Sequence, residues 1–372
     1  MRNAVKSASN GKKPKIALFY DWLNQWGGAE KVLLDLIKIY PEAPIYTLIY
    51  DPQKTKWLPK KIKVVPSVLN KFSLSKKNSI FQTPFYYLSL KHFDFSQYDI
   101  VISTTQVIGH SLIVPKKTLY VCYFHNINRY VYQTPIRFTF LKPFLNQYKK
   151  IDFNFGQKPN YLFCNSQTVQ KRIKNTYKRE AKIIYPGIDT SFFIPSKIDS
   201  HEKYFLIVSR LVSHKKIDLA IEACHQLNKK LYIVGTGRDQ SKLTNLINHL
   251  CDPNIKLLGQ VDNYKLLNLY QNCQALICPQ LEDFGLTPLE AQACGKPVIA
   301  YNQGGLTETV IKNKTGIFFN HQTVSSLVSA LKKFDPKNFS KIICQTNAKN
   351  FSNANFMLNF KKEIDLIWQN HQ

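Results

Sequence analysis

Short runs of apolar residues alternate with helical patterns along most of the chain. The first run, Ile16–Tyr20, is followed by a loop that extends through Gly28. After this loop, four apolar residues fall on one face of a predicted helix: Val32, Leu33, Leu36 and Ile37. Further short apolar runs occur at residues 100–103, 119–124, 161–164 and 182–185. Because these runs are continuous rather than alternating, they predict parallel strands that are buried on both faces.

The same alternation starts afresh after Pro195. A strand is predicted at residues 204–208, a helix at 217–227 and further strands at 231–234, 255–258, 275–278 and 298–300. Strand–helix alternation of this kind indicates doubly wound α/β sheets. We therefore predict two Rossmann-like domains, residues 1–195 and 196–350, with a cleft between them. A final helix is predicted within residues 351–372.

Length and composition fit this division. A chain of 372 residues with 44% hydrophobic residues is long enough for two globular cores. No run approaches the roughly 18 to 20 apolar residues that span a bilayer, and the apolar run after the basic N-terminus is too short for a signal-peptide core. The eight cysteines form no metal-ligand spacing, which favours a reduced, cytoplasmic setting.

The charge is strongly positive and uneven. The formal net charge is +27, and residues 1–195 carry 30 Lys and Arg against 10 Asp and Glu, a net charge of +20. Such an excess attracts polyanions, although a solvated lysine-rich surface would give the same composition. None of the common nucleic-acid-binding motifs occurs, so we expect no nucleic-acid partner.

Ligands of open parallel sheets bind beyond the carboxyl ends of the strands, and two such loops in the first domain carry candidate residues. Gly27 and Gly28 precede a helix, where small residues and free amides suit a phosphate; an ordinary glycine turn is the alternative. His125 directly follows a strand, with Arg129 four residues later. His125 is placed to donate to a substrate oxygen, unless it is a buried histidine with protein partners.

Two loops of the second domain add cations and glycines. Arg210 and Lys215 follow the strand at 204–208, and together they suit a diphosphate, because Arg supplies a fork of donors and Lys a point charge. Gly235 and Gly237 follow the strand at 231–234 and allow a nucleotide base or ribose to approach closely. The spacing lacks the third glycine of a full dinucleotide-binding motif, since position 240 is Gln240.

The most informative loop is Glu282–Glu290, which follows the strand at 275–278. Thr287 is predicted to cap a helix, with Pro288 at its first position and Glu290 at its third. Glu290 then either completes a capping box or binds ribose hydroxyls. Two carboxylates also suggest glycoside hydrolysis, but a hydrolase has no need of the neighbouring cations. No Asp-x-Asp pair is present, so we expect neither a bound metal nor another cofactor.

The motifs together resemble family 4 of the retaining glycosyltransferases. The resemblance rests on EDFGLTPLEAQACGKPVIAYNQGG, together with GGAEKVL, YFHNINRY, NSQTVQKRI, IIYPGIDT, SRLVSHKKIDLAIEA and VGTGRD, which occur in the family's order over about residues 15–320. The sequences of these motifs are most similar to those of the WbaZ-like mannosyltransferase branch. This resemblance implies a GT-B fold, retention of anomeric configuration, and a final helix that packs back on the N-terminal domain.

The resemblance also implies roles for individual residues. Arg210 and Lys215 would bind the donor diphosphate, Glu290 the ribose and Glu282 the hydroxyls of the donor sugar. The remaining donor-binding residues implied are Gly27, Gly28, Gly235, Gly237, Phe284, Gly285, Leu286 and Thr287.

In the first domain, His125 would contact the sugar, and with Arg129 and Gln106 it forms the predicted acceptor site. The sequence departs from the branch at residues 125–129, where a proline-bearing segment is expected. It departs again at Gln106, where the branch has a histidine.

The predicted activity is transfer of a hexose, with mannose and GDP-mannose favoured, to a glycan or lipid-linked acceptor in cell-surface polysaccharide synthesis. Alternatives are a UDP-sugar donor, a non-catalytic nucleotide-sugar-binding protein, and a phosphorylase, which would need a pyridoxal-phosphate lysine that the sequence does not reveal. Peripheral attachment to the anionic inner face of the cell membrane is also predicted. It rests on lysines at 54–63, 71–77, 116–117, 149–150 and 171–182 and on aromatic residues Phe81, Phe85, Tyr86, Tyr87 and Phe93.

Overall fold

The computed structural model describes residues 13–71, 83–132, 142–197 and 203–372. By its internal contacts the chain divides into two compact units. The first comprises Met1–Phe163, Asn175–Ala181 and Ile367–Gln372, and the second comprises Cys164–Lys174 and Lys182–Leu366. The predicted boundary at residue 195 rested on where the strand pattern starts afresh, and it differs from this division.

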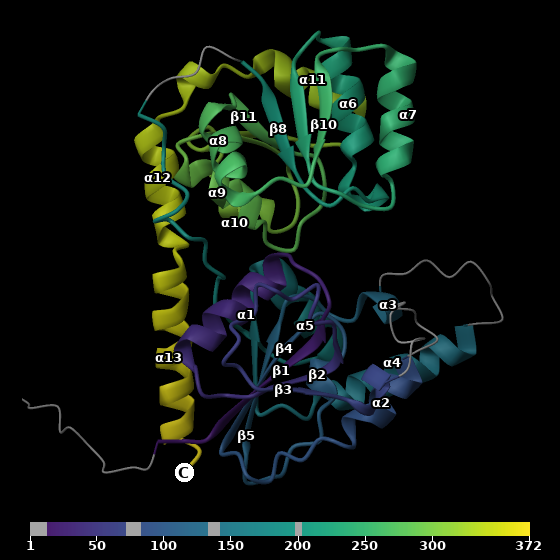
Figure 1. Ribbon diagram of the computed structural model, residues 1–372, viewed down its shortest axis with the longest axis vertical. Helices are drawn as coiled ribbons and strands as arrows, with labels where there is room; N and C mark the ends of the chain where they lie inside the picture. Colours follow the sequence, from purple (N-terminus) through teal and green to yellow (C-terminus); the bar gives the residue numbers. More distant parts are fainter. Residues whose placement is uncertain (1–12, 72–82, 133–141, 198–202) are drawn as a thin grey trace, which may run out of the picture. The chain divides into compact units, whose positions relative to one another are not determined.

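Both units contain a parallel sheet with helices on its two faces (Figure 1). The first sheet has the strand order β3-β2-β1-β4-β5-β6-β7. Its strands are β1 (Ile16–Leu23), β2 (Ile45–Tyr50), β3 (Val64–Pro66), β4 (Ile100–Thr105), β5 (Leu119–Phe124), β6 (Tyr161–Cys164) and β7 (Lys182–Ile183). The helices described between them are α1 (Gly28–Ile39), α2 (Thr83–Leu90), α3 (Arg129–Tyr132), α4 (Lys142–Gly156) and α5 (Gln167–Tyr177), with short 3₁₀ turns η1 (Val68–Lys71) and η4 (Gly109–Ser111).

The second sheet has the order β10-β9-β8-β11-β12-β13. Its strands are β8 (Phe205–Val208), β9 (Leu231–Val234), β10 (Ile255–Gly259), β11 (Ala275–Cys278), β12 (Val298–Tyr301) and β13 (Gly316–Phe319). The helices are α6 (Ile217–Gln226), α7 (Gln240–Leu250), α8 (Asn263–Asn272), α9 (Leu286–Ala293), α10 (Leu306–Thr309), α11 (Val324–Lys333), α12 (Lys341–Asn350) and α13 (Asn353–Gln369), and η6 (Ser213–Lys215) and η7 (Pro336–Asn338) are 3₁₀ turns.

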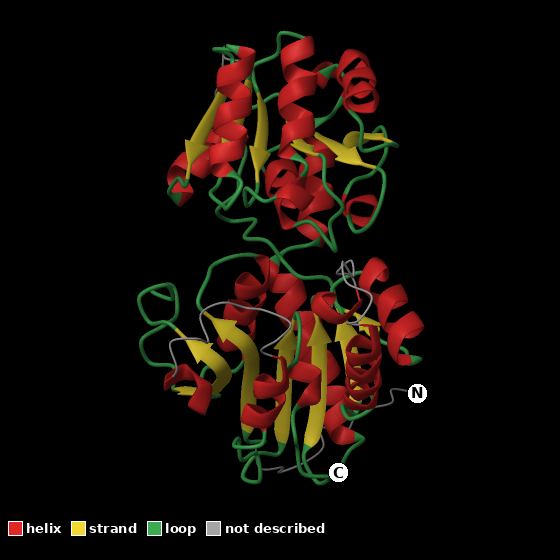
Figure 2. Cartoon of the chain, turned by 90° about the vertical axis from the view of Figure 1, so that its right-hand side faces the viewer, coloured by secondary structure: helices red, strands yellow, loops and turns green. Residues whose placement is uncertain are grey.

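Successive residues of the second sheet's strands enter two different cores. Leu206 of β8 and Leu276 of β11 belong to the cluster that packs under α8 and α9. Ile207 and Ile277, one position later, belong to the cluster that packs under α6 and α11. Both faces of the sheet are therefore buried, as the continuous apolar runs predict. Figure 2 shows the strands of each unit between layers of helices.

The predicted doubly wound α/β architecture is confirmed, and most strands begin within one residue of the predicted position. The first strand extends to Leu23, three residues further than predicted, because it pairs with β2 as far as Tyr50. No helix within the described ranges is long and apolar enough to cross a membrane.

The cysteines are free thiols, and seven of the eight are buried. Burial raises the pKa of Cys224 and of Cys273 to about 12 and that of Cys344 to about 11. Cys251, the residue that follows α7, is the exposed one.

Candidate functional site

The loop after β8 and the loop after β11 meet through an ion pair in the second unit. Lys215 Nζ lies 2.5 Å from Glu282 Oε1, and the two side chains are only 12% and 21% exposed. Gln280 is buried, and its Nε2 donates to the same carboxylate oxygen over 2.7 Å. Three residues from two strand ends thus hold one polar cluster, which includes two of the predicted site residues and one that the sequence analysis missed.

Arg210, from the same loop as Lys215, is exposed. The loop then forms the 3₁₀ turn η6, and Lys216, in a left-handed conformation, precedes α6. Arg210 before the turn and Lys215 at its end therefore both lie on the loop that follows β8, and their binding of a diphosphate stays a prediction.

Helix α9 begins earlier than predicted. Its N-cap is Gly285, with φ +102° and ψ +83°, and Leu286 is its first residue. Only glycine adopts this left-handed conformation without strain. The prediction of Thr287 as the cap and of Glu290 as a capping-box residue is therefore wrong, because a glycine in this conformation starts the helix two residues earlier.

A tyrosine hydroxyl holds the Glu290 carboxylate. Its side chain is 1% exposed, and Tyr270 Oη from α8 donates to Glu290 Oε2 over 2.9 Å. Burial and the Glu290 charge raise the pKa of Tyr270 well above its ordinary value, so Tyr270 remains a donor at any physiological pH. This contact fixes the carboxylate in the second turn of α9.

Gly235 and Gly237 are required by a contact inside the protein. A Cβ on Gly235 would lie 1.9 Å from the Ser209 carbonyl oxygen, and one on Gly237 would lie 2.2 Å from that of Leu211. The Leu211 amide donates to the Thr236 carbonyl over 2.9 Å. The glycines therefore allow the loops after β8 and β9 to pack together, which positions the backbone beside Arg210.

A second glycine pair supports the loop of Glu282. Gly305 donates its amide to the Glu282 carbonyl over 2.8 Å, and a Cβ on Gly305 would lie 2.3 Å from the Cα of Phe284. Gly304, with φ +70°, forms a β-bridge with Glu282. Phe284, a predicted donor-binding residue, is itself buried in the core and stacks on Tyr185.

Two further carboxylates of the second unit contact the first turns of α5. Arg172 pairs with Asp283, the neighbour of Glu282. The Glu308 carboxylate of α10 accepts from the Gln167 amide over 2.7 Å and from the Thr168 amide over 3.1 Å. Since Gln167 and Thr168 begin α5, Glu308 caps this helix from a distant part of the chain. The sequence next to α5 does not predict such a cap.

In the first unit, the Gly27–Gly28 loop leads into α1 as predicted, with Gly27 as its N-cap. Glu30 in the first turn is 1% exposed and accepts from Tyr20 Oη over 2.5 Å and from Gln25 Nε2 over 3.2 Å. Burial, followed by the Glu30 charge, raises the pKa of Tyr20 well above its ordinary value. A buried carboxylate, absent from our predicted site, thus connects the glycine loop to the end of β1.

A second buried carboxylate holds the loop after β4. Asp21 accepts from the amides of Gln106 and Val107 over 2.6 and 2.9 Å and from Thr105 Oγ1 over 2.9 Å. Burial raises the pKa of Asp21, although these hydrogen bonds oppose the shift. Gln106 is thereby fixed by its backbone, and its Nε2 donates to Tyr20 Oη over 3.2 Å.

His125 lies at the end of β5 and is 8% exposed. Its Nε2 forms a 2.7 Å hydrogen bond with Thr104 Oγ1. His125 therefore fits the alternative interpretation, in which it is a buried histidine with a protein partner. Arg129 begins α3, but its side chain lies outside what the structure describes. The acceptor roles of His125, Arg129 and Gln106 stay predictions.

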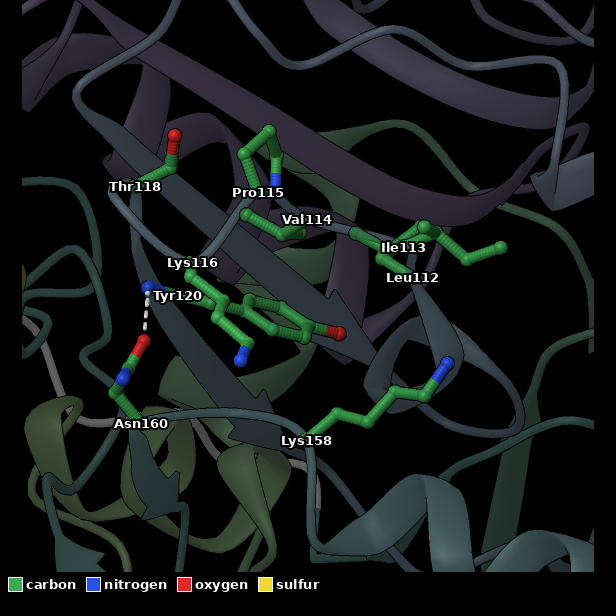
Figure 3. A pocket seen from close by; sticks show the side chains of 9 residues that line it. All are labelled: Leu112, Ile113, Val114, Pro115, Lys116, Thr118, Tyr120, Lys158 and Asn160. Carbon is green, nitrogen blue, oxygen red and sulfur yellow. Dashed lines mark hydrogen bonds between the residues drawn. The ribbon is translucent and has the colours of Figure 1, made fainter.

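A pocket of about 300 Å³ lies at the opposite end of the first sheet (Figure 3). Thr118 and Tyr120 at the start of β5 line it, and Lys116 and Lys158 extend beside the Tyr120 ring. Partial burial lowers the pKa of Lys158. Because the glycine loop and His125 lie at the carboxyl ends of the strands, this pocket does not contain any predicted site residue.

Among the described residues, no group of three or more His, Cys, Asp or Glu side chains is placed to hold a metal ion. Lys215, Glu282 and Glu290 each have a protein partner.

Comparison with known proteins places these features in a family context. Residues 26–192 match the family model described as Glycosyltransferase Family 4, and residues 189–350 match the model described as Glycosyl transferases group 1. The chain carries both domains of a GT-B glycosyltransferase. In this GT-B chain, the loops after β8 and β11 fall in the group 1 match, and the Gly27–Gly28 loop falls in the family 4 match.

Individual relatives agree with this assignment over part of their length. An alpha-1,3/1,6-mannosyltransferase of Dictyostelium discoideum is 32% identical over 185 residues, which are 42% of this chain and 43% of that protein. The chain spans about half the length of the curated relatives it matches, 54% and 43% for two of them.

Solved structures share the GT-B fold over nearly the whole chain. Sucrose-phosphate synthase of Thermosynechococcus elongatus gives a TM-score of 0.78 at 17% identity, covering 96% of this chain and 100% of that one. Anabaena HepE in complex with UDP and glucose gives 0.73 at 20% identity, covering 95% and 100%. These likenesses show the fold.

Proposed function

We propose that the chain is a retaining hexosyltransferase that uses a nucleotide-sugar donor without a metal and acts in cell-surface polysaccharide synthesis. The observation that carries the proposal is a cluster on the loops after β8 and β11: Lys215 and Glu282 form an ion pair there, and Glu290 lies in the second turn of α9, whose first amides have no partner within the helix. A diphosphate needs cations and amides, and a sugar nucleotide needs acceptors for its hydroxyls. This cluster supplies both kinds of group.

The proposed mechanism relies on charge stabilisation. Arg210, Lys215 and the amides of Gly285 and Leu286 stabilise the negative charge that develops on the leaving diphosphate. Glu290 binds the ribose. Lys215 already has a partner in the free protein, so the incoming diphosphate replaces the Glu282 carboxylate, which then becomes available to the hydroxyls of the donor sugar.

The acceptor hydroxyl attacks from the face that the diphosphate leaves, and a phosphate oxygen takes its proton. The described groups around α9 serve as ligands for the donor, and none is assigned as a nucleophile. Trapping a glycosyl adduct on a side chain would contradict this step.

We favour mannose as the sugar and GDP-mannose as the donor, in the WbaZ-like manner, because a mannosyltransferase is among the relatives. The alternative is a UDP-sugar, supported by the similar fold of HepE, which was solved with UDP and glucose. The acceptor is a glycan or a lipid-linked sugar. A non-catalytic nucleotide-sugar-binding protein would keep the same contacts but release no nucleotide diphosphate.

One experiment separates these candidates. Purified protein is incubated with GDP-mannose, GDP-fucose, UDP-glucose, UDP-galactose and UDP-N-acetylglucosamine, and the released GDP or UDP is quantified by chromatography. We expect release from one base class and loss of that release in Glu290→Gln. Nucleotide binding without release from any donor would instead support the non-catalytic candidate.

Peripheral attachment to an anionic membrane is also part of the proposal, with a corrected set of aromatic residues. Tyr86 and Phe93 are buried in the core, and Tyr87 stacks on Phe155, so these three are unavailable. Phe81 and residues 72–77 lie outside the described residues.

The apolar groups that do reach solvent are Phe85, Leu88 and Phe144, which are 58%, 54% and 68% exposed. They lie on α2 and α4, and α4 also carries Lys149 and Lys150. Exposed aromatic residues beside lysines suit the interface of an anionic bilayer.

Vesicle sedimentation tests the membrane proposal. Binding is expected with phosphatidylglycerol-containing vesicles, weaker at high salt and absent with phosphatidylcholine alone. Phe144→Ser should weaken it, whereas Tyr264→Ser, which alters an aromatic residue 79% exposed in the second unit, should not. Equal recovery in the supernatant with both lipids at low salt would refute attachment.

A further inference from the structure

Trp26 presents an aromatic surface directly before the Gly27–Gly28 loop. It is 45% exposed, and its ring lies 5.2 Å from that of Trp57, with the two planes inclined at 51°. A single exposed apolar side chain is ordinary on a protein surface. Two adjacent tryptophans from different loops, at the carboxyl end of a strand where ligands of such sheets bind, form a less ordinary arrangement.

The pair is held on a fixed support. Trp57 Nε1 donates to the Gln25 carbonyl over 3.1 Å, and Gln25 Nε2 donates to the buried Glu30 carboxylate over 3.2 Å. The residue before Trp26 is therefore held through both its backbone and its side chain. A surface fixed before the ligand arrives loses little conformational entropy on binding.

The same carboxylate orients a polar group. Tyr20 Oη donates a hydrogen bond to Glu30 Oε1 over 2.5 Å, so its oxygen lone pairs remain to accept one. Tyr20 then accepts from Gln106, whose Nε2 lies 3.2 Å away. These two hydrogen bonds fix the orientation of the Gln106 side-chain amide: its nitrogen faces Tyr20 and its carbonyl oxygen faces away. Among the described residues, that oxygen accepts from no protein donor.

The chemistry of the two groups selects one class of ligand. The face of an indole ring is negative, and the C–H groups along one face of a pyranose ring carry slight positive charge, so the two stack. A carbonyl oxygen accepts from a hydroxyl group but repels an anion. The arrangement therefore suits a neutral sugar ring rather than a phosphate.

We infer that Trp26, supported by Trp57, is a stacking platform for a neutral pyranose ring of the acceptor, and that the Gln106 carbonyl accepts one hydroxyl of that acceptor. The inference rests on the proposed transferase function and adds the chemical class of the acceptor's terminal residue. Trp26 is a binding residue in this account, whereas Trp57, Glu30 and Tyr20 are positioning residues.

Sugar binding by the full chain tests the inference directly. Saturation-transfer NMR is recorded with methyl α-D-mannopyranoside, methyl α-D-glucopyranoside and methyl α-D-galactopyranoside, in the presence of the nucleotide diphosphate that the protein binds. We expect at least one glycoside to bind, with an affinity about ten-fold weaker in Trp26→Ala and only a few-fold weaker in Trp26→Phe. Trp368→Phe, which alters a partly buried tryptophan of α13, is the matched control and should bind as the parent does.

The positioning residues have their own readout. Tyr20→Phe removes the hydroxyl that orients Gln106 and should raise the KM for the acceptor by a larger factor than it lowers the rate of donor hydrolysis. Equal losses in acceptor use and donor hydrolysis would assign Tyr20 a merely structural role and overturn this part.

Two results would overturn the platform itself. One is a failure of the glycoside test: either Trp26→Ala binds the glycosides as tightly as the parent, or the parent does not bind them at all. The other is quenching of Trp26 fluorescence by vesicles of brominated phosphatidylglycerol with no response to glycosides, which would assign Trp26 to a membrane surface. Nucleotide binding by Trp26→Ala, measured by calorimetry, separates these failures from failure of the proposed function. The variant should bind the nucleotide as tightly as the parent does. If the parent itself binds no nucleotide, the proposed transferase function is refuted.

Discussion

Replacing Lys215 by Met should affect catalysis more than stability, and the structure gives the size of both effects. Lys215 forms a 2.5 Å ion pair with Glu282, and both side chains are mostly buried. Met keeps the aliphatic stem but removes the charge. Glu282 retains its hydrogen bond from Gln280, so the carboxylate is not left without a donor.

The loss of unfolding free energy should be about 1–2 kcal/mol, the range of one hydrogen bond to a charged group after discounting for partial exposure. In a domain of this size that corresponds to a fall in Tm of roughly 2–8 °C. The catalytic loss should be larger, about 10²–10³ in rate, since a group that stabilises transition-state charge contributes about 2.7–4 kcal/mol.

The assay compares release of nucleotide diphosphate by the parent, Lys215→Met and Lys242→Met. Lys242 is an exposed lysine of α7 whose loss changes the net charge equally. Calorimetry should also show that Lys215→Met weakens binding of the nucleoside diphosphate more than that of the monophosphate. A rate within a few-fold of the parent, or an equal loss in Lys242→Met, would refute the assigned role.

Three further results are expected. Glu290→Gln should reduce transfer by about 10²–10³ with circular dichroism unchanged, because the amide still accepts from Tyr270; activity near the parent's would remove Glu290 from the site. Gly305→Ala should lower the unfolding free energy by about 1–3 kcal/mol, since its Cβ would lie 2.3 Å from the Cα of Phe284; an unchanged melting temperature would show that the loop can shift. EDTA should leave transfer unaltered, and a loss that Mg²⁺ or Mn²⁺ restores would contradict the proposed metal-free chemistry.

The parallel sheets were predictable from sequence because their strands are continuous apolar runs, and the order of elements then places polar loops at one edge. The proximity of Lys215 to Glu282 follows from this logic, because β8 and β11 are neighbours in the sheet. Three strands were missed. β3 has only three residues and β13 begins with Gly316, so neither stands out as an apolar run, whereas β2 is apolar except for Thr47 and could have been predicted by the same rule.

The details that sequence did not reveal depend on tertiary contacts. Nothing in the sequence near Glu290 indicates Tyr270, twenty residues earlier, as its donor. Likewise, Glu30 looks like a first-turn glutamate stabilising its helix, and only the fold brings Tyr20 and Gln25 to it. The start of α9 was misplaced because Thr287 and Pro288 are good cap and first-turn residues, and the left-handed Gly285 overrides both.

The distribution of thiols makes it possible to measure local unfolding of this chain by cysteine alkylation. With seven cysteines buried and Cys251 exposed, a maleimide at neutral pH should modify one equivalent quickly and stop. Attack requires the thiolate, and burial suppresses it by raising the pKa of Cys273 and of Cys224. Every further equivalent then reports a local opening event. Cys278 ends β11, four residues before Glu282, so its rate of alkylation measures how often the core beneath the donor loop is exposed.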